Sequence, residues 1–234
     1  MLRKLNLAGA ENEALYDYAL SSLNLTELVL PAHLWTIGTM AIAENMNLQQ
    51  IEIPASVVEI SKRAFEDCRS LAKVTFKGEN LQVIGDWAFY NCHELASINL
   101  PEGVSEIGKA VFYGCAYMQE VHIPASMLAI GDNAFALCSK VNKMEVDAVI
   151  PPTVEAKTFF EVSREAPVYV PDESVETYLA HPIWGELNII GRSHMPQGLE
   201  QVNGQTTTHK ILRDGQILIQ RGDKTYTVQG QEVK

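Results

Sequence analysis

The sequence predicts a repeat solenoid, in which short coils of backbone stack on a parallel β-sheet. Three observations predict this fold: one block recurs every 23 or 24 residues, each block opens with an apolar alternation, and four successive blocks carry a Phe at one later position, usually after Ala. The opening residues of the blocks are Leu2, Leu25, Leu48, Leu71, Leu95, Met118 and Val141. Self-similarity at this period is typical of repeat architectures, in which one coil cannot bury its apolar face alone.

One block justifies each element of a coil in order. Its clearest copy has the pattern positions Leu95, Ile98, Leu100, Pro101, Val104, Ile107, Gly108, Phe112 and Cys115. The first apolar alternation has period 2 and predicts a short strand. The proline ends this strand, because proline has no N–H to give to a neighbouring strand. The second apolar pair predicts a shorter second strand, and the glycine after it suits a tight turn.

Stacking at the spacing of strands, about 4.8 Å, places equivalent residues of successive coils above one another. The sequence therefore predicts two interior ladders, one of phenyl rings and one of thiols: Phe65, Phe89, Phe112 and Phe135, and Cys68, Cys92, Cys115 and Cys138. Eight first strands are predicted if the last lies at Pro167–Pro171. Turns and short helical segments are expected on the other side of the coils.

The weakest copies lie at the two ends of the array, where capping makes degenerate repeats expected. The second block has Ile42 and Asn45 where later blocks have Phe and Cys, and the seventh block loses the turn pattern before Pro151 and Pro152. The first block begins at Leu2 without a preceding cap. We therefore expect the natural protein to begin upstream of Met1, as a longer array or a longer chain.

The frame Leu-x-x-Ile-x-Leu-Pro-x-x-Val-x-x-Ile-Gly-x-x-Ala-Phe-x-x-Cys resembles the BspA-like leucine-rich repeat of the Treponema pallidum type. The resemblance covers residues 2 to 191, and its closing segment includes Tyr178, Trp184 and Gly191. A short helix is expected at 172–180, with Asp172 or Ser174 as its N-cap. The resemblance implies a leucine-rich-repeat solenoid at 1–191. It also implies a bacterial surface or secreted protein of a family in which some members bind host proteins.

The C-terminal region reads as a polar linker at 192–208 and a small β-hairpin or meander at 209–234. Three strand-like runs, 210–212, 217–219 and 225–228, are separated by Asp214-Gly215 and Gly222-Asp223. Asp-Gly between alternating apolar residues predicts a hairpin. The tail resembles the type IX sorting segments of Bacteroidetes surface proteins. The alternative is a cap or appended hairpin with no sorting role.

The charge balance argues against two classes of partner. The net charge is −11, and residues 1–191 hold 12 basic and 25 acidic residues, which disfavours binding to nucleic acid or to an anionic membrane. The sequence contains no stretch of 18 apolar residues and no signal-peptide pattern, so no membrane span is predicted. Oligomeric state is not predicted by any feature.

The four cysteines occupy one repeated position, which favours buried free thiols packed as small apolar residues. Disulfides remain an alternative, since they form in exported proteins. A metal site is disfavoured because no Cys-x-x-Cys or Cys-x-x-His cluster exists. The six histidines also lack metal-ligand spacing, and no phosphate-binding or nucleophile motif is present. The sequence therefore predicts a protein that is not an enzyme and has no cofactor.

A candidate binding face is predicted from the outward side chains of the first strands. These are Lys4, Asn6, Glu27, Val29, Gln50, Glu52, Lys73, Thr75, Ser97, Asn99, Glu120, His122, Lys143 and Glu145. The row is polar and of mixed sign, with no aromatic residue before Tyr169. Interface hot spots favour Trp, Tyr and Arg, so a solvated face with no ligand is the alternative. If the face binds, a protein or peptide fits it better than a glycan.

These features are compatible with three functions. A non-catalytic surface or secreted recognition scaffold, binding a protein or matrix partner, is the leading hypothesis. The second is a structural spacer that positions another domain. A glycan-processing accessory enzyme is least favoured, because the sequence offers no convergent catalytic set.

Overall fold

A computed structural model describes residues 3–195, 208–213, 216–221, 224–227 and 232–233 of the chain. The chain divides into two compact units, Met1–Met195 and Pro196–Lys234. Arg192–His194, which we assigned to the linker, form a short 3-10 helix, η3, within the first unit. Residues 196–207 of the predicted linker lie outside the described residues.

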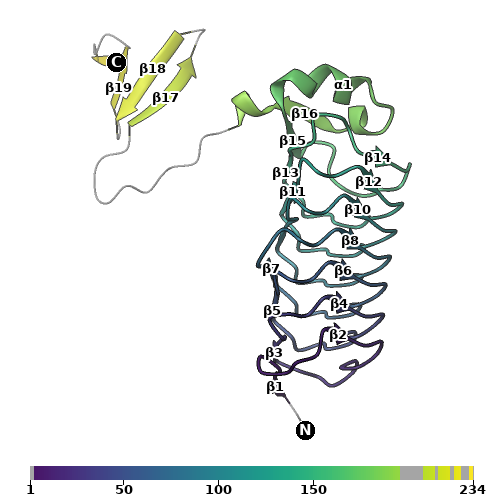
Figure 1. Cartoon of the computed structure of the whole chain (residues 1–234). Coiled ribbons are helices and arrows are strands. Elements are labelled where there is room, and N and C mark those ends of the chain that lie inside the picture. Colours follow the sequence, from purple (N-terminus) through teal and green to yellow (C-terminus); the bar gives the residue numbers. More distant parts are fainter. Residues whose placement is uncertain (1–2, 196–207, 214–215, 222–223, 228–231, 234) are drawn as a thin grey trace. The chain divides into compact units, whose positions relative to one another are not determined.

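The first unit is the predicted solenoid, and its fold class is confirmed (Figure 1). Its first strands are β1 (Lys4–Asn6), β3 (Glu27–Val29), β5 (Gln50–Ile53), β7 (Lys73–Phe76), β9 (Ser97–Asn99), β11 (Glu120–Ile123), β13 (Lys143–Val146), β15 (Pro167–Val170) and β16 (Asn188–Gly191). The described residues thus hold nine first strands and not eight. The additional strand, β16, pairs in parallel with β15. It was not predicted because it begins with a polar residue after a helical segment and so lacks the apolar alternation of the other first strands.

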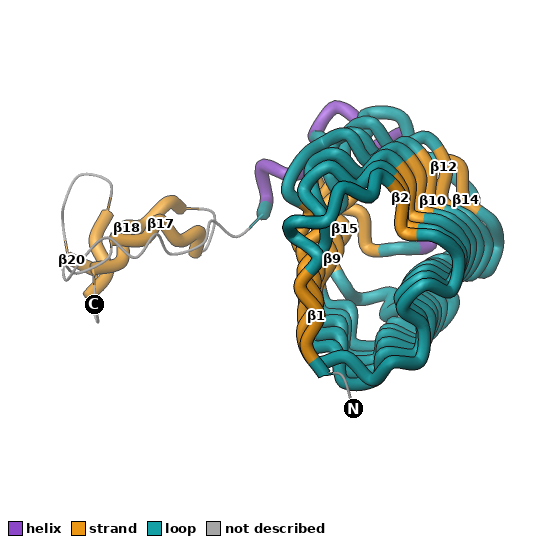
Figure 2. The backbone as a smooth tube through the Cα atoms, turned by 60° about the horizontal axis from the view of Figure 1, so that its bottom comes forward, coloured by secondary structure: helices purple, strands orange, loops and turns teal. Residues whose placement is uncertain are grey.

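The second strands form one continuous parallel sheet of seven. They are β2 (Ala14–Leu15), β4 (Thr36–Ile37), β6 (Glu59–Ile60), β8 (Val83–Ile84), β10 (Glu106–Ile107), β12 (Ala129–Ile130) and β14 (Thr153–Val154). Each pairs in register with its neighbours, so that Ile107 lies between Ile84 and Ile130. Viewed along the stack, the coils follow one path, with first strands on one side and second strands on another (Figure 2).

Tight turns, and not helices, close each coil on the side away from the first strands. Two turn positions adopt left-handed backbone, with φ between 51° and 74°. The first does so in six coils and the second in seven: Tyr18, Met40, Arg63, Trp87, Ala110 and Asn133, and Ser22, Glu44, Asp67, Asn91, Gly114, Leu137 and Glu161. A non-glycine residue there costs about 1–2 kcal/mol. Hydrogen bonds to the adjacent coil offset this cost; Phe89 N–H donates to the Val111 carbonyl at 2.9 Å.

The glycine after the second strand has a different role from the one we predicted. Gly108 and Gly131 do not have positive φ. A Cβ on Gly131 would lie 2.5 Å from the backbone of Gly108, and a Cβ on Gly108 would lie 2.6 Å from the backbone N of Asp86. Glycine is therefore favoured here because adjacent coils approach closely, and not because the turn is strained; Ser61 is accommodated at the same position between Gly38 and Gly85.

The phenyl ladder forms the centre of the core. Phe65, Phe89, Phe112 and Phe135 are fully buried, and their ring centroids are 4.9, 5.5 and 5.3 Å apart in nearly parallel stacks. Phe159 continues the ladder at 6.0 Å. The seventh coil, in which we predicted loss of the turn pattern, thus keeps a ring in the ladder that the sequence prediction did not include. Thr158 replaces the usual Ala and donates to the Gly131 carbonyl at 3.1 Å, which satisfies its buried hydroxyl.

The thiol ladder consists of four buried free cysteines. Each thiol donates to a backbone carbonyl of the preceding coil; Cys92 reaches Phe65 at 3.3 Å and Cys138 reaches Phe112 at 3.2 Å. Burial raises the pKa of Cys68 and of Cys138 to about 12. At the same position in the second coil, Asn45 donates to two carbonyls and accepts from the Leu25 N–H at 3.0 Å.

The C-terminal end of the solenoid is covered by η1 (Asp172–Ser174), α1 (Val175–Ala180) and η2 (Trp184–Glu186). The Tyr178 hydroxyl donates to the Ala148 carbonyl at 2.7 Å, and Trp184 Nε1 donates to the Pro152 carbonyl at 2.9 Å. The Trp184 ring lies 4.8 Å from that of Phe159 and so ends the aromatic ladder. The predicted helix is present, but neither Asp172 nor Ser174 makes a side-chain cap. None of the described helices has the length and apolar character to cross a membrane.

The second unit contains an antiparallel sheet in the order β17 (Thr208–Arg213), β18 (Gln216–Arg221), β19 (Lys224–Thr227) and β20 (Glu232–Val233). Three strands were predicted, and the fourth, β20, pairs Val233 with Thr225. The Asp-Gly and Gly-Asp pairs expected at the turns lie outside the described residues.

Candidate functional site

The first strands position the predicted binding face, which we call the first-strand face: the outward side chains predicted above. Period-2 alternation sends the partners of these residues into the core, and Leu28, Ile51, Ile98 and Val121 are buried. Most predicted residues are exposed, while Thr75, His122, Lys143 and Glu145 are half-buried. Tyr169, the only aromatic residue at the end of the row, is buried and not available to a ligand.

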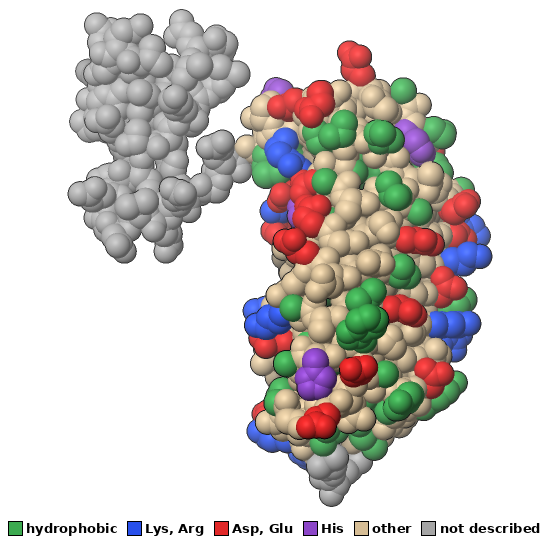
Figure 3. All heavy atoms as spheres, viewed as in Figure 1, with side chains coloured by type: hydrophobic (Ala, Val, Ile, Leu, Met, Phe, Trp, Pro, Cys, Tyr) green, Lys and Arg blue, Asp and Glu red, His purple; other side chains and the backbone are tan. Residues whose placement is uncertain are grey.

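Ionic contacts link neighbouring strands along this face. The register pairs Lys4 with Glu27, and the two side chains form an ion pair. Glu27 lines the first hollow described next, whereas Lys4 lies outside both hollows. Asn6 accepts a hydrogen bond from the Ala8 N–H and also lies outside both hollows. Figure 3 shows acidic and basic side chains interspersed along the margin where Figure 1 places the first strands.

The first hollow of the face lies over β3, β5 and β7 and has a volume of about 720 Å³. Six predicted residues line it: Glu27, Val29, Gln50, Glu52, Lys73 and Thr75. Lys77, which sequence reasoning did not select because it lies beyond the strand, also lines it and pairs with Glu52 at 2.8 Å. Val29 contributes an apolar side chain that is 46% exposed.

The backbone ladder is interrupted beside this hollow. Over residues 24–55, all described, no backbone hydrogen bond joins β3 to β5, whereas β5 and β7 pair over four residues. Near this break the Ser56 hydroxyl can donate to the carbonyl of Ala32 or of Leu34, which lie at 2.9 and 2.8 Å. The same two coils are also joined by the backbone pairing of β4 with β6. Two short strand edges with unpaired main-chain groups therefore face this part of the surface.

The second hollow lies over β9, β11 and β13 and has a volume of about 340 Å³. The predicted residues that line it are Ser97, Asn99, Glu120, His122, Lys143 and Glu145. Lys143 Nζ pairs with Glu145 at 3.0 Å and with Glu120 at 3.3 Å. The hydrogen bond to Glu145, followed by that to Glu120, raises the pKa of Lys143, although partial burial opposes the shift.

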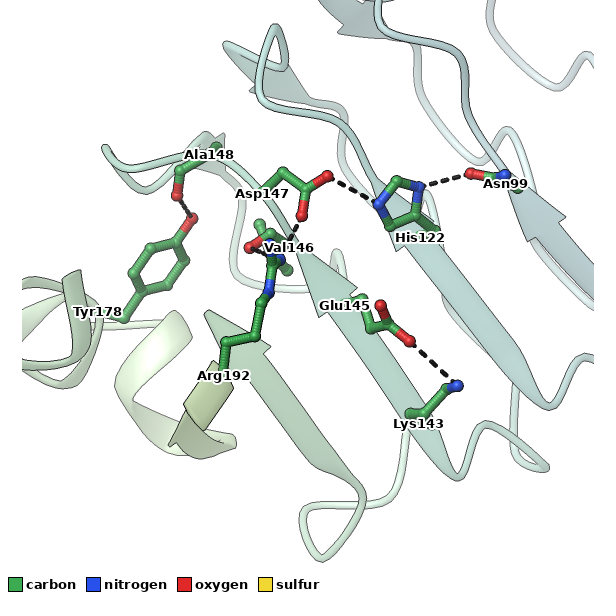
Figure 4. Close-up of polar contacts among 9 residues, drawn as sticks. All are labelled: Asn99, His122, Lys143, Glu145, Val146, Asp147, Ala148, Tyr178 and Arg192. Carbon is green, nitrogen blue, oxygen red and sulfur yellow. Dashed lines mark hydrogen bonds and ion pairs between the residues drawn. The ribbon is translucent and has the colours of Figure 1, made fainter. Parts of the chain in front are cut away.

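A polar chain crosses the edge of the second hollow (Figure 4). His122 Nδ1 contacts the Asn99 amide oxygen, and its Nε2 lies 2.8 Å from the Asp147 carboxylate. Asp147 also pairs with Arg192, whose guanidinium donates to the Val146 carbonyl at 3.2 Å. Sequence reasoning missed Asp147 and Arg192, since Asp147 follows β13 outside the alternation and Arg192 comes from η3, in the segment predicted as linker.

The polar groups of this face do not assemble a recognisable catalytic set. Within the described residues, no group of three or more His, Cys, Asp or Glu side chains is arranged to hold a metal ion. The carboxylates beside His122 and Lys143 are engaged in ion pairs with them. What the arrangement offers is a row of hydrogen-bonding and charged groups on a regular surface, with two hollows of different character.

Comparison with known proteins places the repeats in a family. The sequence profile described as "BspA type Leucine rich repeat region" matches six copies over residues 13–142. A solved structure of a leucine-rich-repeat protein from T. pallidum is 28% identical, with a TM-score of 0.50, covering 56% of this chain and 61% of that chain. This chain therefore spans less than two thirds of the length of that protein.

Two other solved structures have lower similarity. A leucine-rich-repeat protein from Bacteroides ovatus is 17% identical over 82% of this chain and 70% of its own, with a TM-score of 0.35. A leucine-rich cell surface protein from Faecalibacterium prausnitzii is 18% identical over 81% of this chain and 61% of its own, with a TM-score of 0.40. No curated protein sequence matches this chain. On its repeats and their match over more than half of its length, the chain belongs to the BspA-type leucine-rich-repeat family.

Proposed function

We propose that this protein is a non-catalytic recognition scaffold that binds an extended segment of a protein partner on its first-strand face. The interruption between β3 and β5 beside the first hollow carries this proposal. Exposed strand edges offer main-chain donors and acceptors to an extended peptide, which is a common mode of peptide recognition. Membership of a repeat family of solenoid scaffolds supports the non-catalytic part.

The side chains around the first hollow fit a peptide of mixed character. Val29 offers apolar area, and Lys73 forms no ion pair with any described residue. The Glu52–Lys77 pair is solvent-exposed on both sides, so partner charges could displace it at little cost. A segment that combines an apolar residue with an acidic one, the latter directed at Lys73, would suit this surface.

The second hollow supports a different role. Its charged groups already contact one another, and the His122–Asp147–Arg192 chain ties η3 to β11 and β13. A ligand there would have to break contacts that the protein makes for itself. We assign this hollow to holding the C-terminal end of the solenoid, with the peptide site at the first hollow.

The test is peptide selection on the immobilised full chain, followed by fluorescence anisotropy with the recovered peptides. The double variant Glu52→Ala/Lys73→Ala, which keeps the net charge, should raise the Kd at least tenfold. Glu106→Ala/Lys140→Ala, also neutral and outside both hollows, is the matched control. Equal affinity for both variants would contradict the proposal. If Asn99→Ala/His122→Ala also weakened peptide binding, the peptide site would extend over the whole first-strand face.

A spacer is the second candidate function, and one observation favours it. Much of the charge on the face is self-paired, as in Lys4–Glu27 and Lys143–Glu145, which is the arrangement of a solvated face. A spacer would yield no peptide above background in the same selection. Its solenoid would still fold, so circular dichroism separates this outcome from a misfolded sample.

We further propose a cell-surface or secreted location, with the C-terminal unit as a sorting segment. Family membership supports the location. The antiparallel strands β17–β19 suit the proposed tail, although a purely structural hairpin would have the same strands. Deleting residues 196–234 should retain the protein inside a Bacteroidetes host that has type IX secretion. Unchanged export would contradict the sorting role and favour a C-terminal unit that is only a structural hairpin.

A further inference from the structure

A further pocket, separate from the two hollows, lies in the turns that follow the second strands, away from the first-strand face. It has a volume of about 390 Å³ and is lined by the rings of Trp87, Tyr90 and Tyr113. All three rings are half-buried, which leaves part of each accessible. Three aromatic residues in adjacent coils do not follow from the repeat pattern, because the interior ring of each coil is the separate phenyl ladder.

A small residue in the neighbouring coil creates this pocket. Arg63, Trp87, Ala110 and Asn133 occupy one turn position in four successive coils, all with positive φ. On one side, Lys62 Nζ and Arg63 Cζ lie 4.9 and 5.3 Å from the Trp87 ring. On the other side, Ala110 contributes only a methyl group. The indole face on this side is therefore left free above Ala110, with Asn133 beyond it.

Two tyrosines form the second wall. The rings of Tyr90 and Tyr113 stack at 5.1 Å with an interplanar angle of 10°. Burial, then the neighbouring Tyr113 and acidic groups, raises the pKa of Tyr90. Its phenolic hydroxyl can both donate and accept a hydrogen bond. Because the two rings cover one another, they present edges and hydroxyl groups and do not form a closed aromatic cage.

Polar groups complete the rim. The Asn133 amide donates to the Asp132 carboxylate at 2.8 Å, which fixes both side chains. The Lys109 N–H donates to Asp86 at 2.7 Å, and the exposed Lys109 side chain forms no ion pair with any described residue. The rim thus offers an amide, a carboxylate and an ammonium group within one pocket.

We propose that this pocket binds a neutral pyranose residue of a glycan. A free indole face packs against the C–H groups on one side of a pyranose ring, while amide, carboxylate and ammonium groups bond its hydroxyls. A cationic ligand is disfavoured by Lys109 on the rim and by Lys62 and Arg63 behind Trp87, and an anionic one by Asp132. The volume falls at the lower end of small-ligand pockets, about 300–1,000 Å³, and so suits one or two sugar rings.

The test uses the full chain and saturation-transfer NMR with the methyl glycosides of glucose, galactose, mannose and N-acetylglucosamine, and with tetramethylammonium as a cationic probe. At least one glycoside should bind and tetramethylammonium should not. Trp87→Ala should weaken that glycoside at least tenfold; the backbone tolerates Ala here, because Ala110 has the same φ region. Ala110→Phe should abolish binding by filling the pocket while keeping every ring, and Tyr18 shows that an aromatic residue fits this turn position.

Trp35→Ala is the matched control, since Trp35 is 65% exposed and lies outside the pocket. Circular dichroism checks that each variant folds. Binding of no glycoside, binding of tetramethylammonium alone, or equal glycoside affinity in Ala110→Phe and the parent would each overturn the proposal. These readouts do not involve the first-strand face, so they succeed or fail independently of peptide binding.

Discussion

The inward and outward sides of each coil obey different rules. Inside, one residue type recurs at one position: the rings of Phe65 to Phe135 stack, and the thiols of Cys68 to Cys138 bond carbonyls in the same way. Outside, the residue after each ring changes from coil to coil, from Glu66 to Tyr90 and to Phe160. Only the interior is constrained by the stack, because coils share their cores and not their surfaces.

This contrast teaches where function can reside. A change at a ladder position affects the packing of two neighbouring coils, so it needs compensation, such as the backbone hydrogen bonds that Asn45 and Thr158 make. Outward positions can vary freely, so hollows and aromatic pockets arise where a chain departs from its own repeat. Ala110 beside Trp87, and the break between β3 and β5, are such departures.

The largest expected effect that would test the interior rule is loss of stability at alkaline pH. The pKa of the Cys68 and Cys138 thiols is raised from 9.0 to about 12 in the folded protein. The unfolded chain therefore releases these protons first, so the stabilisation is complete below pH 9 and is lost as pH rises toward 12. Each pH unit in that window costs about 1.4 kcal/mol per thiol.

Urea unfolding at pH 8.0, 9.5 and 10.5 measures this dependence. The variant Cys68→Ala/Cys138→Ala should be less stable at pH 8.0 but should lose stability less steeply as pH rises. Parallel slopes for parent and variant would show that the thiols are not what titrates in this window.

The next effect distinguishes the two sides of one coil. Phe112→Ala should lower the free energy of unfolding by about 3–5 kcal/mol, because its ring is fully buried between Phe89 and Phe135 and a cavity would remain. The adjacent outward change Tyr113→Ala should cost about 1 kcal/mol or less, since it removes one half-exposed stack. Chemical denaturation of both variants checks the difference, and similar losses would break the comparison.

A smaller effect is expected where the interior repeat is interrupted. Asn45→Ala should cost about 1–3 kcal/mol, because the Leu25 N–H and the carbonyls of Leu20 and Ile42 would be buried without their partner. Asn47→Ala, at an exposed position two residues away, is the control. A thermal melt that is unchanged by Asn45→Ala would mean that water replaces the amide.

The interior of the solenoid was predictable because its residues recur at fixed positions in each repeat. The Phe and Cys ladders, the first strands and the second strands follow from periodicity and alternation alone. Phe159 and β16 were missed where the surrounding residues departed from the pattern, although their packing continues it. There, stacking on the previous coil determines the structure, and a single block of sequence carries no signal of its neighbour.

The candidate site was predictable only in part. Alternation correctly identified which side chains face outward, but not that Glu27, Glu52 and Lys73 share one hollow while His122 lies in another. Arg192 reaches Asp147 from 45 residues away. Such contacts depend on the curvature of the stack and on its closing segment, which periodicity does not encode.

A stabilising change tests the cost of the left-handed turns. Glu161 has φ of 62° and an exposed side chain. Glu161→Gly should raise the free energy of unfolding by about 0.5–1 kcal/mol. Glycine removes the strain of a left-handed residue that has a Cβ, but the greater conformational entropy of glycine in the unfolded chain offsets part of this gain. Glu161→Ala keeps its Cβ and should give no gain. Differential scanning calorimetry on the three proteins would detect the shift, and a gain for Ala would point to charge removal as its cause.

The smallest effect separates stability from recognition on the outward face. Glu27→Ala removes the Lys4–Glu27 pair, but both side chains are more than 60% exposed, so the free energy of unfolding should change by about 0.5 kcal/mol or less. Glu27 also lines the first hollow, so the same variant should weaken a selected peptide more than it weakens the fold. Denaturation and anisotropy on one sample give both numbers. A variant that lost stability and affinity in equal measure would show that the outward face is, after all, part of what holds the coils together.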